Sequence, residues 1–301
     1  MDAVELNKLT RRFGSFLAVN EVSLKIKQGS IYGFLGPNGS GKSTTIRMLC
    51  GLLAPTSGGG SILGLDIDRD SEALKYKIGY MSQKFSLYDD LTVIENLTFY
   101  AGMYSLPRDT EKTRIKEMLA LANLESRQHE LAVSLSGGWK QRLALGCAIL
   151  HNPPILFLDE PTGGVDPKSR RIFWDIIYGL STQGTTVMVT THFMDEAEHC
   201  DEIGFLFDGS LIASGTPESL KKIIPGTLLE IPSSEPMQLL ETLEARKINY
   251  LDIYPFGANL HVLAEAEQVE QFASYPYKTI APSLEDVFVY LVKSHRKEMV
   301  A

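Results

Sequence analysis

Short apolar runs in the first part of the chain predict buried β-strands. Ile31–Leu35 and Ile155–Leu158 are mostly or wholly apolar, a pattern typical of strands covered on both faces in a parallel sheet. Other runs alternate apolar and polar residues or contain β-branched residues, and these also predict strands. The full set of predicted strands is Val4–Leu9, Glu21–Ile26, Ile31–Leu35, Ser61–Leu65, Ile78–Gln83, Ile155–Glu160, Thr185–His192, Ile203–Phe207 and Leu211–Ala213. Asp208-Gly209 predicts a tight hairpin between the last two, and Pro55–Gly60 reads as a loop.

Apolar residues spaced three and four apart predict helices between these strands. One helix is expected over Thr44–Leu53, and Lys84–Val133 is expected to be largely helical. Within that segment, Thr92 and Glu95 have the spacing of a capping box at the start of a helix. A further helix begins near Leu135–Trp139, so a helical insertion over about 84–150 separates two halves of the sheet.

The pattern changes between Pro217 and Gly226, where we place a domain boundary. The expected elements beyond it, in the order βαββαβ and followed by a last helix, are Thr227–Ile231, Met237–Arg246, Tyr250–Tyr254, Leu260–Leu263, Glu265–Ala273, Lys278–Ile280 and Ser283–Val292. This order is typical of a ferredoxin-like module. We therefore expect one domain over 1–220 and a smaller α+β domain over 226–301.

A phosphate-binding loop follows the strand Ile31–Leu35. The residues that match the pattern G-x-x-x-x-G-K-[ST] and continue into the next helix are Gly36, Pro37, Asn38, Gly39, Ser40, Gly41, Lys42, Ser43 and Thr44. The glycines leave backbone N–H groups accessible to a phosphate, and the following helix N-terminus favours anions. Lys42 suits the β- and γ-phosphates, and the Ser43 hydroxyl suits Mg²⁺. The sequence therefore predicts a nucleoside triphosphate site.

Polar side chains stand at the ends of three predicted strands: Gln83, Asp159 with Glu160, and His192. The carboxyl ends of parallel strands meet at one edge of a sheet, so these side chains are expected around the phosphates. Asp159 is placed to hold Mg²⁺, and Glu160 to act as general base for water. The alternatives are a buried ion pair with a scaffolding role for the carboxylates and a structural role for His192.

Two other features have a structural and a functional interpretation. Phe13, ahead of the phosphate loop, is either a core residue or an aromatic ring stacked against adenine. Ser136 and the glycines Gly137 and Gly138 lie at a helix N-terminus, which makes them a second potential anion site.

Composition narrows the class of protein. The formal net charge of -8 disfavours nucleic acid as a partner. The cysteines Cys50, Cys147 and Cys200 are far apart and read as buried apolar residues of a reducing compartment. No apolar run approaches the roughly 20 residues of a membrane span, and the acidic start of the chain is unlike a signal peptide. We expect a cytoplasmic or peripheral protein.

Taken together, these motifs resemble the nucleotide-binding subunit of an ABC transporter. Over Val4 to about Leu220, Gly36–Thr44 resembles Walker A, Ile155–Glu160 Walker B, Gln83 the Q-loop, Leu135–Trp139 the LSGGQ signature, Gly164–Asp166 the D-loop and His192 the switch histidine. Trp139 departs from the usual final Gln of the signature. The resemblance implies a P-loop NTPase, with a RecA-like core, an antiparallel β subdomain and a helical signature subdomain.

The resemblance also implies ATP as cofactor and a head-to-tail dimer, most simply of two identical chains. Ser136, Gly137 and Gly138 of one subunit would contact the γ-phosphate held by the other. Ser43, Gln83 and Asp159 would organise Mg²⁺, Glu160 would polarise water, and His192 and Asp166 would link hydrolysis to the partner. Phe13 would then stack on adenine.

More narrowly, the chain is similar to the ATPases of ABC-2 exporters, including drug-resistance types. Met81–Tyr88, Thr190–Ala197 and Ser283–Phe288 carry this likeness. It implies a separate integral-membrane permease, an export ATPase on the cytoplasmic face of the membrane, and a docking groove near Phe85, Leu87, Tyr88 and Tyr104. The alternatives are a non-transport ABC ATPase acting on ribosomes or DNA, and an inactive regulatory cassette. The role of 226–301 stays open.

Overall fold

The computed structural model describes residues 1–300, and the chain forms two compact units. The first unit is Met1–Thr216 and the second begins at Pro217. Each unit has a sheet and an apolar core of its own, so each is described separately below.

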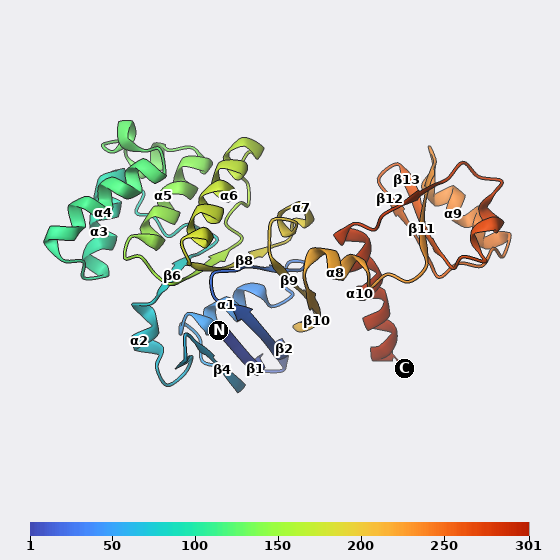
Figure 1. Cartoon of the computed structure of the whole chain (residues 1–301), viewed down its shortest axis with the longest axis horizontal. Helices are drawn as coiled ribbons and strands as arrows, with labels where there is room; N and C mark the ends of the chain where they lie inside the picture. Colours follow the sequence, from blue (N-terminus) through green and yellow to red (C-terminus); the bar gives the residue numbers. More distant parts are fainter. Residues whose placement is uncertain (301) are drawn as a thin grey trace. The chain divides into compact units, whose positions relative to one another are not determined.

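A six-stranded, mainly parallel sheet forms the centre of the first unit (Figure 1). Its strands, in the order in which they lie side by side, are β10 (Ser210–Gly215), β9 (Glu202–Phe207), β3 (Ile31–Leu35), β8 (Thr186–Thr191), β7 (Ile155–Asp159) and β6 (Ile78–Met81). Only β10 is antiparallel to its neighbour, through the hairpin at Asp208-Gly209. The carboxyl ends of β6, β7 and β8 therefore meet at one edge, as the sequence predicts.

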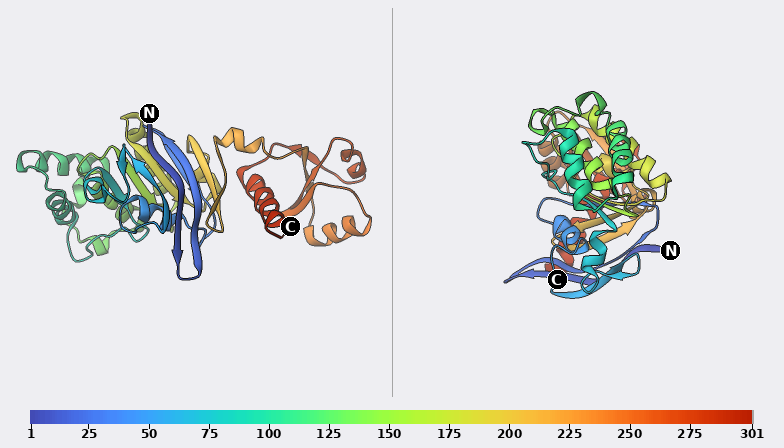
Figure 2. Two further views of the ribbon diagram at one scale, coloured as in Figure 1. Left: turned by 90° about the horizontal axis from the view of Figure 1, so that it is seen from below. Right: turned by 90° about the vertical axis from the view of Figure 1, so that its left-hand side faces the viewer.

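A second sheet is antiparallel and has the order β2-β1-β4-β5. Its strands are β1 (Asp2–Phe13), β2 (Phe16–Lys27), β4 (Ser57–Ile62) and β5 (Leu65–Asp66). The long β1–β2 hairpin stands out in Figure 2. The expectation of a loop up to Gly60 is wrong, because β4 already pairs with β1 from Ser57. Gly58 and Gly60 make this possible, since a Cβ at either would lie within 2.5 Å of a backbone oxygen of β1.

The helices of the first unit lie on both faces of the central sheet and in a bundle beside it (Figure 1). They are α1 (Lys42–Leu49), α2 (Ser71–Lys75), α3 (Val93–Met103), α4 (Arg108–Leu121), α5 (Gly137–Ile149), α6 (Pro167–Thr182) and α7 (Met194–Ala197), with 3-10 turns η1 (Glu125–Arg127) and η2 (Ala132–Ser134). The capping box of Thr92 and Glu95 is confirmed at the start of α3. The helix α6, with Asp166 as N-cap and Pro167 at its first position, was missing from the predicted elements.

The core of the first unit joins the two sheets through α1. One cluster of buried apolar residues includes Leu9 and Val22 of the antiparallel sheet, Phe157 of the central sheet, and Ile46 of α1 between them. The helix that follows the phosphate loop is thus fixed from both sides. It ends at Leu49, earlier than predicted, because Gly51 turns the chain with a φ of 66°.

The second unit has a four-stranded antiparallel sheet with the order β12-β13-β11-β14. Its elements are α8 (Pro217–Lys221), β11 (Thr227–Pro232), α9 (Pro236–Ala245), β12 (Asp252–Phe256), β13 (Asn259–Ala264), η3 (Val269–Phe272), β14 (Lys278–Ile280) and α10 (Leu284–Val300). The interleaved strand order is that of a ferredoxin-like sheet. The helix expected over Glu265–Ala273 is absent from the described structure, where only the 3-10 turn η3 forms.

A buried polar network holds α10 against this sheet. Asp286 of α10 is fully buried, and its Oδ1 lies 2.7 Å from His261 Nδ1 and accepts a 2.8 Å hydrogen bond from the Tyr254 hydroxyl. Its Oδ2 accepts from the backbone N–H and the hydroxyl of Ser283, at 2.7 and 2.6 Å. Burial by itself raises the pKa of this carboxyl, but the hydrogen bonds outweigh it and hold the pKa at about 2.

Within residues 1–300, no helix is both long and apolar enough to cross a lipid bilayer.

The network around Asp286 predicts a loss of stability in acid. Because its folded pKa lies below the ordinary value of 3.8, the stabilisation is present above that value and is lost as the pH falls towards 2. At neutral pH it amounts to roughly 2 kcal/mol. Asp286→Asn should lower the free energy of unfolding by about that amount at pH 7. The free energy of unfolding of wild type and variant is measured by chemical denaturation, and the difference between them should shrink below pH 4. A difference that does not vary with pH would contradict the lowered pKa of Asp286.

Candidate active site

The phosphate loop connects β3 to α1 and is packed too closely for side chains at two of its glycines. A Cβ at Gly36 would lie 2.2 Å from the Leu206 carbonyl oxygen. Gly41 has a φ of 102°, and a Cβ there would lie 2.4 Å from the Ala18 carbonyl oxygen. The loop therefore leans on β9 and β2, and only glycine fits at these two positions.

Lys42, the first residue of α1, has its ammonium group directed into this loop. Its Nζ donates to the carbonyl oxygens of Gly36 and Pro37, at 2.8 and 3.0 Å. The same atom lies 3.2 Å from Glu160 Oε1. Lys42 is only 3% exposed and Glu160 9%, so this is a largely desolvated ion pair.

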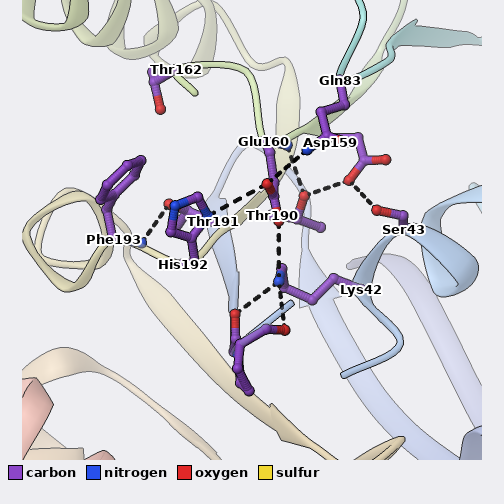
Figure 3. A network of polar contacts seen from close by, with 12 residues as sticks. Lys42, Ser43, Gln83, Asp159, Glu160, Thr162, Thr190, Thr191, His192 and Phe193 are labelled. Carbon is purple, nitrogen blue, oxygen red and sulfur yellow. Dashed lines mark hydrogen bonds and ion pairs between the residues drawn. The ribbon is translucent and has the colours of Figure 1, made fainter. Parts of the chain in front are cut away.

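Glu160 lies at the centre of the site, immediately after β7 (Figure 3). Its Oε2 accepts a 3.0 Å hydrogen bond from Gln83 Nε2 and lies 3.4 Å from His192 Nδ1. Gln83 follows β6 and His192 follows β8, so the three predicted strand ends do meet here. The carboxylate therefore has partners from three separate segments of the chain.

The backbone of Glu160 is unusual as well. Its φ of 47° lies in the left-handed region, which costs a non-glycine residue about 1 to 3 kcal/mol. The Glu160 N–H donates to the backbone and hydroxyl oxygens of Thr190 on the neighbouring strand, at 3.2 and 2.9 Å. These bonds hold the residue in a conformation that turns its side chain toward Lys42.

Asp159 and Ser43 provide oxygen atoms beside the phosphate loop. Asp159 Oδ1 accepts hydrogen bonds from the Ser43 and Thr190 hydroxyls, each at 2.8 Å. Among residues 1–297, whose side chains the structure describes, no group of three His, Cys, Asp or Glu side chains is placed to hold a metal alone. Mg²⁺ prefers one or two carboxylates together with substrate phosphates. The Ser43 and Asp159 oxygens fit that requirement.

A cavity of about 320 Å³ opens over these groups. It is lined by Phe16, Ala18, Asn38, Gly39, Gly41, Lys42, Ser43, Thr44, Gln83 and Glu160. The first N–H groups of a helix have no partner within the helix, and Lys42–Thr44 form the first turn of α1. Backbone donors, an ammonium and a hydroxyl thus face one space, which is the donor set that a triphosphate needs. Ser40 supports the loop through its carbonyl oxygen, which accepts from Gly209.

Two aromatic residues lie at the tip of the β1–β2 hairpin. The sequence singles out Phe13, whereas the lining includes Phe16. The two residues are directly opposite each other across the β1–β2 hairpin, so their side chains share one face. Phe13 is 45% exposed, and the Arg11 guanidinium carbon lies 4.6 Å from its ring centroid. We keep Phe13 as a predicted adenine contact and add Phe16, which the sequence reasoning missed.

The signature segment lies outside the cavity lining. Ser136 is the N-cap of α5 and is exposed, as is Gly137. Gly138 is buried and packs closely against α6, since a Cβ there would lie 2.3 Å from Ser169 Oγ. The Trp139 ring is flanked by the guanidinium carbons of Arg142 and Arg127, at 4.0 and 5.0 Å. This helix N-terminus is therefore exposed, and it takes no part in the cavity at its own phosphate loop.

The signature helix is nevertheless attached to the site through the chain after Glu160. Gln141, in α5, is fully buried and donates a 2.9 Å hydrogen bond to the Pro161 carbonyl oxygen. Asp166 caps α6 by accepting from the Ser169 N–H at 3.0 Å, and hydrogen bonds from Ser169 keep the pKa of its carboxyl below the ordinary value. Asp166 is exposed and lies outside the cavity lining, like the signature residues.

The β3–α1 loop, the strand order and the acidic end of β7 together define a P-loop NTPase of the ABC cassette type. Residues 19–163 match the family model described as ABC transporter. The chain is 52% identical to the probable multidrug ABC transporter ATP-binding protein YbhF of Escherichia coli, over 72% of this chain and 38% of that protein. It therefore spans well under half of the length of that relative.

Two other similar proteins are matched over almost their whole length. The Nod factor export ATP-binding protein I of Rhizobium etli is 34% identical, over 97% of this chain and 93% of that protein. A dimeric ATP-binding cassette, MJ0796, solved in a post-hydrolysis state with ADP and Pi, is 30% identical with a TM-score of 0.65, over 71% of this chain and 98% of that chain. This chain belongs to the ABC transporter family of ATP-binding proteins.

The aromatic pair generates a prediction for nucleotide binding. Replacing a ring that stacks on a base typically costs 1–3 kcal/mol, so Phe13→Ala should weaken ATP binding about tenfold, and Phe16→Ala similarly. The Kd is measured by titration with a fluorescent ATP analogue. Phe99→Ala serves as control, because Phe99 is similarly exposed but lies on α3. If only Phe16→Ala weakened ATP binding, the adenine contact would be assigned to Phe16 instead of Phe13.

Proposed function

We propose that this chain is the ATP-hydrolysing motor subunit of an ABC exporter. The observation that carries the proposal is the position of the Glu160 carboxylate, within 3.4 Å of Lys42, Gln83 and His192 beside the phosphate loop. A carboxylate so placed can accept a proton from water that attacks the γ-phosphate. The names of the relatives, multidrug transporter and Nod factor export proteins, support the export direction.

The residues of the site then have distinct tasks. Lys42 and the first turn of α1 bind and orient the phosphates. Glu160 holds the attacking water, and His192 and Gln83 keep the carboxylate aimed at it through their contacts with Oε2. When bound through Ser43 and Asp159, with Gln83 nearby, Mg²⁺ would neutralise charge on the phosphates.

The proposed working form is a head-to-tail dimer. Ser136 and Gly137 are exposed at the N-terminus of α5, where the helix dipole favours an anion. They lie outside the cavity lining of their own chain, so their ligand would be the γ-phosphate of a second copy. The solved cassette MJ0796, which is dimeric, supports this arrangement by analogy.

The proposed membrane partner is a permease of the ABC-2 type, with this chain at its cytoplasmic face. An apolar cavity of about 340 Å³ lies between the end of α1, α2, β6 and the end of α3. It is lined by Cys50, Leu52, Glu72, Lys75, Tyr76, Ile78, Tyr80, Met103 and Tyr104. Tyr88, which is 44% exposed, is connected to Tyr104 of this lining through successive ring contacts with Phe99 and Tyr100. Such a surface suits a short helix of a permease.

The role of Glu160 predicts the behaviour of Glu160→Gln. Loss of a general base lowers turnover by roughly 10²- to 10⁴-fold, while the amide keeps its size. We expect ATPase activity to fall by at least a hundredfold and an ATP-bound dimer to accumulate on a size-exclusion column. Glu218→Gln, which changes an 80% exposed side chain of α8, is the matched control. Turnover near that of wild type would refute the base assignment.

The dimer model predicts that Ser136→Arg blocks turnover without unfolding the protein. Ser136 is exposed, so a long side chain is tolerated in the single chain but fills the space of the second nucleotide. Thr182→Arg places the same charge at the exposed end of α6 and should leave activity unchanged. The readouts are steady-state ATPase activity and ATP-dependent dimerisation in the Glu160→Gln background. Normal turnover in Ser136→Arg would contradict the shared site.

A further inference from the structure

Glu196 is a buried carboxylate to which neither the sequence motifs nor the proposed mechanism assigns a role. It lies in α7, just after the switch histidine, and is 1% exposed. Its Oε2 accepts a 2.7 Å hydrogen bond from the Thr191 hydroxyl, and its Oε1 accepts from the Thr162 hydroxyl. Arg170 Nε lies 3.3 Å from Oε1, as an ion pair without hydrogen-bond alignment. Three segments of the chain thus meet at one carboxylate.

On one side, Glu196 is linked to the loop that carries His192. The Thr191 hydroxyl, which donates to Glu196, also accepts a 3.0 Å hydrogen bond from the Phe193 N–H. His192 therefore lies between Thr191 and Phe193, which contact each other through the Thr191 hydroxyl (Figure 3). That contact depends on the orientation of the hydroxyl. The Phe193 ring is also covered by Arg170, whose guanidinium carbon lies 4.5 Å from the ring centroid.

On the other side, Glu196 is attached to the segment between Glu160 and Asp166. Thr162 lies in that segment and is 1% exposed, so its hydroxyl is held in place by this one carboxylate. Arg170 belongs to α6, and its N–H donates to the Asp166 carbonyl oxygen at 3.0 Å. The position of the 161–166 segment and that of His192 therefore share a common support.

We propose that Glu196 is a positioning residue for hydrolysis, which sets the His192 ring against Glu160 and couples its position to the 161–166 segment. This inference rests on the proposed ATPase function. The Thr162 and Thr191 hydroxyls each donate to a different oxygen of Glu196. This arrangement requires that both oxygens act as acceptors. The amide of Glu196→Gln has the same shape but only one acceptor oxygen. One of the two hydroxyls then faces the amide NH₂ group and must accept a hydrogen bond instead of donating one. The side chain no longer holds Thr191 and Thr162 together, so the link between His192 and the 161–166 segment is weakened.

The kinetic test is a double-mutant cycle with ATPase activity as readout. Glu196→Gln should lower kcat about tenfold to a hundredfold, as expected for a misplaced catalytic group. The KM for ATP should stay within about twofold, because Glu196 is outside the cavity lining. In the His192→Ala background, the same change should lower kcat by less than about twofold, since the two residues act as one unit. Additive effects would overturn the proposal.

A second readout does not depend on activity. In spectra of protein with ¹³C-labelled histidine, His192→Ala assigns the His192 ring signal. Glu196→Gln should shift that signal in the full chain. A change confined to His199, which follows α7, would show a merely local effect and overturn the proposal. If wild type hydrolyses no ATP, the proposed function fails, yet the shift of His192 still tests the positioning.

Asp195→Asn is the matched control for both readouts. Asp195 neighbours Glu196 and pairs with the same Arg170 at 3.3 Å, but its side chain is 71% exposed. Its removal should leave both kcat and the His192 signal unchanged. An effect equal to that of Glu196→Gln would mean that Arg170 pairing, rather than the two threonine contacts, positions His192, which would also overturn the proposal.

Discussion

The burial of a negative charge next to the phosphate loop is the constraint on which the rest of the site depends. A desolvated carboxylate is costly unless it is paired, and Glu160 finds its partners on α1 and after β6 and β8. Its left-handed backbone is held by Thr190 on the adjacent strand. Because all of these partners come from different segments, a displacement of any one changes the environment of the same carboxylate. The same contacts therefore define the sheet edge and the site.

The strand order decides which groups can share that edge. β3, which leads into the phosphate loop, lies between β9 and β8. The next strand is β7, which ends in Asp159 and is followed by Glu160. The ammonium of Lys42, the carboxylates of Asp159 and Glu160 and the ring of His192 therefore come together from distant parts of the sequence. The exposed N-terminus of α5 lies outside this cluster, although Gln141 attaches its helix to Pro161. The proposed dimer rests on this arrangement, with a hydrolytic centre on one chain and an anion-binding helix end supplied to the other.

Local signals in the sequence explain most of what could be predicted. The strands of the central sheet are short apolar runs, and the capping box of Thr92 and Glu95 is a contact between near neighbours. The errors have physical causes. The Ser57–Gly60 strand lacks apolar residues, because its glycines fit against β1 rather than burying side chains. The sequence pattern predicts a helix over Glu265–Ala273, but a single 3-10 turn is enough to bury Phe272, the large apolar side chain of that segment. The start of α6 carried an N-cap and a proline that could have been used.

The sequence by itself determined the phosphate loop, the polar ends of the buried strands and hence the chemistry of the site. Those features depend on residue type and on spacing within a few positions. Only the tertiary structure decided that Phe16 lines the cavity, that Thr190 holds Glu160, and that Glu196 joins Thr162 to Thr191. Apart from Glu196 with Thr191, these are contacts between residues far apart in the chain, made by the pairing of neighbouring strands and the packing of loops on them. The spacing of residues along a single strand or helix carries no information about such contacts.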